Sequence, residues 1–111
     1  MIEADRVELL AGEPEAVMMP TENEGGQKVS RCPAYRPVLG NTYSGFGDAI
    51  RFVRVRTLED ADQIPPDNHI HGASKQAWVA LPEGARVVAG YHAREEVWGA
   101  ENLARGRQLA G

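Results

Sequence analysis

The chain has 111 residues, of which 42% are hydrophobic and 25% are charged, and its formal net charge is −4. These values are ordinary for a soluble globular protein and predict a single domain over residues 1–111. The dispersed negative charge argues against nucleic-acid binding, and no apolar run approaches the roughly 20 residues of a membrane helix. Because a lone cysteine, Cys32, suits a reducing compartment, we expect a cytoplasmic protein.

The first half of the chain predicts short strands separated by turns, which is typical of an antiparallel sheet. The expected strands are residues 6–10, 16–19, 27–31, 38–43 and 49–58. In the last of these, the alternation of apolar and polar residues breaks down, because Ile50 and Phe52 share a face with Arg54. Either a bulge near Phe52 and Val53 returns the apolar residues to one face, or the strand is buried on one face only after Val53.

The second half predicts three shorter strands and then a helix. The strands are residues 69–73, 78–80 and 87–88, and the composition favours helix from Arg94 to about Leu109. Acidic residues in the first turn and arginines near the end complement the helix dipole. No Ser, Thr, Asp or Asn precedes this helix, so we expect a frayed start.

Cys32 lies in the sequence Arg-Cys-Pro-Ala-Tyr, where a zinc knuckle would require Cys-Pro-x-Cys. Position 35 carries Tyr35, whose phenol titrates near pH ~10 and cannot replace a thiolate. We therefore expect Cys32 to be a structural residue or a vestigial metal ligand. The alternative is a reactive thiol whose pKa is lowered by Arg31 and Arg36.

His69 and His71 are two positions apart, so on a strand both rings would project from one face. Two imidazoles on one face could bind a transition metal, with His92 or Cys32 as a third ligand. The sequence favours the simpler interpretation, in which His69 makes a structural hydrogen bond and His71 is incidental.

Three other features have simple structural interpretations. Ser74 and Lys75 are adjacent, so on a strand they point to opposite faces and cannot form a nucleophile–base pair. Trp78 and Trp98 are large enough to anchor the core, and the alternative for Trp78 is stacking on a ligand.

Three stretches together suggest a family. Residues 31–39 (RCPAYRPVL) are similar to a Cys-Pro-x-Cys motif followed by a short strand. Residues 55–79 contain VRTLED, PPDNHI and ASKQAWV, similar to a strand-loop-strand signature, and residues 94–105 are similar to a terminal helix. Over about residues 7–109 the chain resembles the glutathione-dependent formaldehyde-activating (GFA) family, whose domain also occurs in centromere protein V.

The resemblance implies a mainly β fold, an antiparallel β-tent-type domain closed by one C-terminal helix. The family's activity is of the carbon–sulfur lyase or S-(hydroxymethyl)glutathione synthase type and depends on zinc bound by several cysteines. Some of those cysteines lie in an N-terminal Gly-x-Cys-x-Cys-Gly segment, and only Cys32 has a counterpart here. The resemblance thus predicts a degenerate zinc site, a chain truncated at its N-terminus and no bound cofactor. A separate hypothesis is that the Tyr35 ring fills the space left by the metal and offsets its loss.

Three functions follow as expectations. The first is a zinc-less, catalytically inactive relative that either serves as a binding or assembly module or is not maintained at all. The second is an active lyase for a glutathione adduct, with metal recruited by His69 and His71 or by a partner chain. The third is a homodimer formed through a sheet edge that missing N-terminal strands leave open. The expected small-molecule ligand is of the glutathione type, and Arg54 and Arg56 either bind its carboxylate or form an exposed pair.

Overall fold

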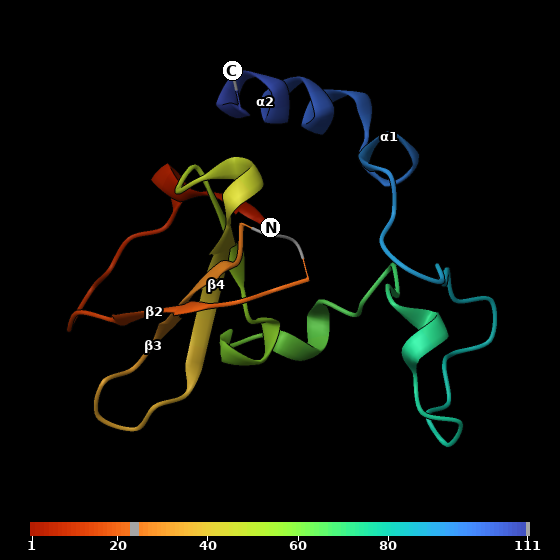
Figure 1. The fold of residues 1–111 in the computed structure, drawn as a ribbon, viewed down its shortest axis with the longest axis horizontal. Helices are drawn as coiled ribbons and strands as arrows, with labels where there is room; N and C mark the ends of the chain where they lie inside the picture. Colours follow the sequence, from red (N-terminus) through yellow and green to blue (C-terminus); the bar gives the residue numbers. More distant parts are fainter. Residues whose placement is uncertain (23–24, 111) are drawn as a thin grey trace. The chain divides into compact units, whose positions relative to one another are not determined.

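The computed structural model describes residues 1–22 and 25–110 (Figure 1). The chain divides into two compact units. The first comprises residues 1–61 together with the end of the chain from Arg107, and the second comprises residues 62–106.

The first unit contains a five-stranded antiparallel sheet with the order β1-β5-β4-β3-β2. Its strands are β1 (Ile2–Glu3), β2 (Glu15–Met19), β3 (Gln27–Arg31), β4 (Val38–Tyr43) and β5 (Ile50–Val53). Strands β2 to β5 follow one another as a meander, and β1 returns to pair with β5. The antiparallel sheet is confirmed, as are the strands predicted at residues 16–19, 27–31 and 38–43.

Two predicted strands of this unit need correction. Residues 6–10 are not a strand, because Ala4–Arg6 form a 3₁₀ turn and residues 7–10 have no regular structure. The strand predicted at 49–58 ends at Val53, and Val55–Thr57 form another 3₁₀ turn. The alternation is lost because the strand stops there, so no bulge occurs near Phe52. The irregular register lies instead between Ser30 and Arg31, opposite β4.

One face of the sheet carries most of its apolar side chains. The strand register places Val17, Val29, Asn41 and Phe52 side by side across β2 to β5. The Phe52 ring packs edge-on against Tyr43 at 4.8 Å. Asn41 is buried on this face, and its side-chain Nδ2 donates a hydrogen bond to the side-chain Oε1 of Gln27 at 3.1 Å. The buried polar side chain of Asn41 at the centre of the sheet is therefore hydrogen-bonded, as buried polar groups generally are.

The core of the molecule is small. Among the residues that the structure describes, Ile50 is the one buried hydrophobic side chain, at 5% exposure. The other buried side chains of the sheet are those of Asn41 and Thr42. Most of the large apolar residues thus remain in contact with solvent.

The second unit is built mainly from turns. Its one β contact among the described residues is an isolated parallel bridge between His69 and Val87. Residues 78–80 are not a strand, and the predicted strand at 69–73 stops at once because His71 has a left-handed backbone (φ 56°). A 3₁₀ turn over Gly72–Ser74 follows. A non-glycine residue at positive φ cannot continue a pleated strand, so the strand prediction at 69–73 is wrong. The prediction at 78–80 is also wrong, because residues 77–78 form a turn and residues 79–80 have no regular structure.

The C-terminal helix is confirmed but is broken into two. The helix α1 spans Arg94–Val97 and the helix α2 spans Ala100–Ala110, separated by Trp98 and Gly99. No side chain caps the start of α1, as predicted. Strands and helical turns occupy similar shares of the chain, so the description "mainly β" becomes an antiparallel sheet with a comparable helical content. In the described part of the chain, no helix is long and apolar enough to cross a membrane.

Candidate functional site

The loop that joins β3 to β4 folds back on Cys32. The Cys32 amide donates a hydrogen bond to the carbonyl oxygen of Pro37 at 3.0 Å, and the Arg36 amide donates to the carbonyl oxygen of Cys32 at 2.8 Å. Arg36 takes the left-handed conformation, with φ 68°, which reverses the chain before Pro37. The result is a tight turn that begins and ends beside the cysteine. We call residues 32–37 the Cys32 turn.

The Cys32 turn directs backbone N–H groups at its own sulfur. Hydrogen bonds from the amides of Tyr35, Ala34 and Arg36 lower the pKa of the Cys32 thiol, the Tyr35 amide contributing most, while partial burial opposes them. Hydrogen bonds to the charged form of an acid stabilise that form. The turn therefore lowers the pKa of the Cys32 thiol without any metal.

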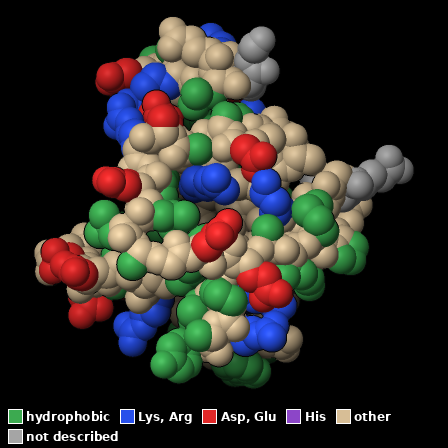
Figure 2. Space-filling model, turned by 90° about the vertical axis from the view of Figure 1, so that its left-hand side faces the viewer, with side chains coloured by type: hydrophobic (Ala, Val, Ile, Leu, Met, Phe, Trp, Pro, Cys, Tyr) green, Lys and Arg blue, Asp and Glu red, His purple; other side chains and the backbone are tan. Residues whose placement is uncertain are grey.

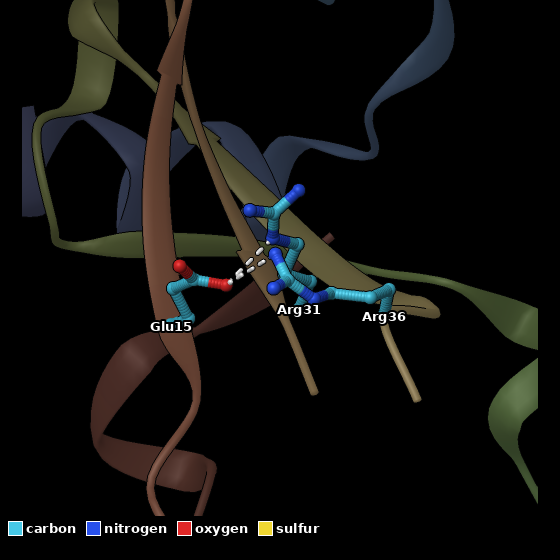
Figure 3. Close-up of polar contacts among 3 residues, drawn as sticks. All are labelled: Glu15, Arg31 and Arg36. Carbon is cyan, nitrogen blue, oxygen red and sulfur yellow. Dashed lines mark hydrogen bonds and ion pairs between the residues drawn. The ribbon is translucent and has the colours of Figure 1, made fainter. Parts of the chain in front are cut away.

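The two arginines beside Cys32 are bound elsewhere. Figure 3 shows one oxygen of the Glu15 carboxylate of β2 facing both Arg31 of β3 and Arg36 of the Cys32 turn. One Glu15 oxygen lies 2.8 Å from Arg31 Nε and 3.5 Å from Arg36 Nη1. The hydrogen bond from Arg31 and the two positive charges lower the pKa of Glu15. The backbone amides, and not these guanidinium charges, are thus what lowers the pKa of the Cys32 thiol, unlike in the alternative considered from the sequence.

Tyr35 does not occupy the place of a metal. Its side chain is 88% exposed, so the ring points into solvent and not onto the sulfur. The expectation that this ring fills a space left by zinc is wrong. Position 35 contributes its backbone amide, and not its ring, to the surroundings of the Cys32 sulfur.

The histidines of the second unit do not share a strand face. His69 is half-buried in its bridge with Val87, while His71 is exposed and left-handed. His92 makes different contacts: its Nδ1 lies 2.9 Å from the Asn68 side-chain nitrogen, and the Tyr91 ring stacks on it at 4.5 Å. The premise that one strand aligns the rings of His69 and His71 is therefore wrong.

The residues present do not fit the zinc that the resemblance implies. A structural zinc site takes four ligands, and the Cys32 turn offers one sulfur. Within residues 1–22 and 25–110, no group of three or more His, Cys, Asp or Glu side chains could hold a metal ion. No step of any reaction is therefore assigned to a metal in this chain.

Three of the remaining candidates, Ser74, Lys75 and Trp78, are on the surface. Ser74 ends the 3₁₀ turn at Gly72, and the ammonium group of Lys75 reaches the neighbouring carbonyl oxygen of Gln76, so the two do not form a pair. Trp78 is 81% exposed, so its prediction as a core anchor is wrong. Trp98 is half-buried, and a Cβ added at Gly106 would lie 2.9 Å from its ring, so Trp98 packs directly on α2.

Arg54 and Arg56 do not lie on one strand face. β5 ends at Val53, and Arg56 belongs to the following 3₁₀ turn. Both side chains are exposed, in agreement with the simpler of the two expectations.

Sequence analysis missed the role of Glu15. In the hairpin of β2 and β3, Glu15 is the direct cross-strand partner of Arg31. Counting this register outward from the loop would have placed the two side chains on one face. The contact of Asn68 with His92 joins residues 24 positions apart, and no local sequence pattern indicates it.

Comparisons with protein-family models, with curated proteins and with solved structures find no match. The resemblance to the GFA family thus depends on the three sequence stretches alone and stays a prediction.

Proposed function

We propose that this chain is a zinc-less relative of the GFA family, with a β-tent-type fold, that works in the cytoplasm as a binding or assembly module and not as a carbon–sulfur lyase. The sequence support is the similarity of residues 31–39, 55–79 and 94–105 to the family's motifs. The sheet of the first unit and the C-terminal helix α2 are compatible with that resemblance.

The observation that carries the proposal is the exposure of large apolar side chains. Leu10 is 88% exposed, Trp78 81% and Met18 65%, whereas Ile50 alone is a buried hydrophobic residue within the described part of the chain. Figure 2 shows hydrophobic side chains at the surface between acidic and basic ones. Covering exposed apolar side chains is favourable, so a partner that buries some of them would gain binding energy. A module that binds a partner accounts for this surface better than a self-sufficient enzyme does.

The Cys32 turn supports the second half of the proposal. It stabilises a thiolate, but it brings one sulfur where a zinc ion would need four ligands. The ligand class that we propose is a glutathione-type small molecule, whose carboxylates suit exposed guanidinium groups such as those of Arg54 and Arg56.

Metal analysis tests the loss of lyase chemistry. We expect protein purified in the presence of zinc to retain far less than one zinc per chain, and Cys32→Ser to retain the same amount. We also expect no acceleration of S-(hydroxymethyl)glutathione formation. Stoichiometric zinc that disappears in Cys32→Ser, together with catalysis, would overturn the proposal in favour of the active lyase.

A second candidate function, a reactive thiol, is favoured by the amide hydrogen bonds to the Cys32 sulfur. The pH dependence of alkylation by iodoacetamide tests it, because only the thiolate reacts. We expect the midpoint for Cys32 to lie below the ordinary value of 9.0. The matched control carries Cys32→Ser and Ala34→Cys, which moves the thiol to an exposed position of the same turn. Equal midpoints in the two proteins would exclude the reactive thiol.

A further inference from the structure

The sheet of the first unit has two edges of unequal length. At one edge β1 contributes only Ile2–Glu3, and at the other β2 contributes the five residues Glu15–Met19. β2 pairs with β3 along its whole length, from Glu15 opposite Arg31 to Met19 opposite Gln27. In an antiparallel pair, alternate residues of an edge strand point their N–H and C=O groups outward. No other strand of the described residues pairs with these groups of β2.

β2 lacks the usual protection of an edge strand. Natural edges carry outward charges, especially lysine, or bulges that prevent pairing with another chain. The sequence of β2, EAVMM, has one charge, and that carboxylate of Glu15 is bound by Arg31 of β3 and by Arg36 of the Cys32 turn. Met18 and Met19 are 65% and 46% exposed. The edge is therefore regular over five residues, and from Ala16 to Met19 it is apolar.

We propose that a second copy of this chain pairs with β2, antiparallel to it, about a two-fold axis through Val17. The inference builds on the proposed assembly function and names its partner. A two-fold axis brings the same surface of both copies together, so one self-complementary strand suffices. Two sheets of five strands would then continue as one sheet.

The sequence of β2 is self-complementary in this register. Val17 faces Val17 of the second copy on one side of the sheet, and Ala16 faces Met18 on the other. Such apolar cross-strand pairs stabilise sheets. Pro14 and Pro20, which lack an N–H group, face each other just beyond the two ends of the ladder, so they limit it to five residues.

Charge does not oppose the pairing. Glu15 faces Met19 of the second copy, and the two Glu15 residues lie about 13 Å apart along the strands. That separation exceeds the Debye length of about 8 Å at physiological ionic strength. Since five residue pairs bury less than the roughly 800 Å² per partner of stable complexes, we expect a reversible dimer with a Kd in the micromolar to millimolar range.

Sedimentation velocity over a concentration series, with the full chain, tests the interface. We expect a reversible shift from monomer to dimer that Met18→Glu weakens at least tenfold. In the monomer this carboxylate faces Lys28 of β3, which favours folding, but in the dimer the two carboxylates become diagonal neighbours roughly 7–8 Å apart. The matched control is Ile64→Glu, which places the same charge at an exposed apolar position of the second unit. A chain that stays monomeric at millimolar concentration, or a dimer equally weakened by both variants, would overturn the inference.

Disulfide trapping tests the register. In a Cys32→Ser background, Val17→Cys places the two thiols opposite each other, and we expect oxidation to give a covalent dimer. Met19→Cys is the control, since its two thiols would lie about 13 Å apart in this register, beyond the reach of a disulfide. Faster cross-linking through position 19 than through position 17 would contradict the axis at Val17.

The dye 1-anilinonaphthalene-8-sulfonate separates this inference from the proposed function, because it binds exposed apolar surface. Dye binding by the folded monomer without any dimer would overturn only the pairing of β2. Absence of dye binding at every concentration would overturn the proposed function itself. Dye binding that falls as the dimer forms would support both.

Discussion

The two units differ in how their strand-like sequences are used. Residues 15–53 of the first unit form four consecutive antiparallel strands, whereas residues 69–88 of the second, which also carry β-branched residues in short runs, form one isolated bridge. The four strands are neighbours along the chain, so each finds its partner through a nearby turn. The comparison teaches that an alternating pattern becomes a strand only where the topology supplies a partner.

The bridge in the second unit is parallel, which requires a crossover between its strands. His69 bonds through its amide to the carbonyl oxygen of Arg86 at 2.8 Å, and the Val88 amide returns to the carbonyl oxygen of His69 at 2.9 Å. The connecting residues 70–86 hold no long helix that could cover such a sheet. The left-handed His71 then ends the ladder after one bridge.

The largest predicted effect concerns the first unit. Ile50→Ala removes most of its one buried hydrophobic side chain within the described residues, and we expect a loss of about 2–5 kcal/mol in the free energy of unfolding. Hydrogen exchange should accelerate in β2 to β5 and stay unchanged in residues 62–106 if the two units unfold separately.

The control is Ile64→Ala in the second unit, where the side chain is 49% exposed. We expect it to change stability by no more than about 0.5 kcal/mol. Equal losses of stability from both alanine variants, or hydrogen exchange that accelerates equally in both units, would contradict the division of the chain into two separately unfolding units.

The second prediction concerns the bridge. A Cβ at Gly72 would lie 2.6 Å from Val87 Cγ1 and 3.1 Å from the carbonyl oxygen of Val88. We therefore expect Gly72→Ala to destabilise the second unit by about 1–3 kcal/mol, measured by denaturant unfolding. Gly90→Ala is its control, because a Cβ there meets nothing within 4 Å. If the two variants behave alike, residues 69–73 and 86–90 do not pack as closely as the structure has them.

The predictable part of the fold is the part set by local signals. Short apolar runs between proline- and glycine-containing turns were sufficient to predict β2, β3 and β4. Amino-acid composition was sufficient to predict the helical region. The break at Trp98 and Gly99 was missed, although glycine has a low helix propensity and Gly99 was visible in the sequence. The packing of the Trp98 ring near Gly106, eight residues away, was not predictable from local signals. The end of β5 at Val53 follows from the turn at Val55–Thr57, whose residues have no strong turn preference of their own.

The sequence identified the residues of the site but not the interactions that they make. The sequence singled out Cys32 and its arginines, but charge proximity along the chain suggested that Arg31 and Arg36 act on the thiol. In the structure the pairing of β2 with β3 brings Glu15 to both guanidinium groups, and the backbone turn supplies the N–H groups to the sulfur. Cross-strand neighbours and backbone directions are set by tertiary structure, so neighbouring residues in sequence could not reveal them.

A smaller effect is expected from the Glu15 ion pair in the hairpin of β2 and β3. The pKa of Glu15 is lower in the folded protein than its ordinary value of 4.5, chiefly through the hydrogen bond from Arg31. Its contribution to stability is therefore present above pH 4.5 and is lost as the pH falls through the lower folded value.

The difference in Tm between wild type and Glu15→Gln should accordingly be modest at neutral pH, shrink in acid, and shrink also with added salt. Taking this difference removes the contribution of Asp48, whose pKa is lowered by its hydrogen bond from Lys28 in both proteins. Glu13→Gln, at an exposed position before the strand, should show no such pH dependence. A difference that grows as the pH falls would have the wrong sign for this ion pair.

The smallest expected effect is that of Tyr35→Ala on stability. It distinguishes a Cys32 turn held by its backbone from one in which the Tyr35 ring fills the place of a metal. If the Tyr35 ring filled the space beside the sulfur, Tyr35→Ala would cost about 3–5 kcal/mol, as for a buried aromatic residue. With 88% of the side chain exposed, we expect a change within about 0.5 kcal/mol and an unchanged alkylation midpoint of Cys32, because the amide at position 35 is retained. Tyr35→Pro removes that N–H donor, so it should raise the midpoint while truncating the same ring. A large loss of stability in Tyr35→Ala would mean that the ring, and not the backbone, holds the turn together.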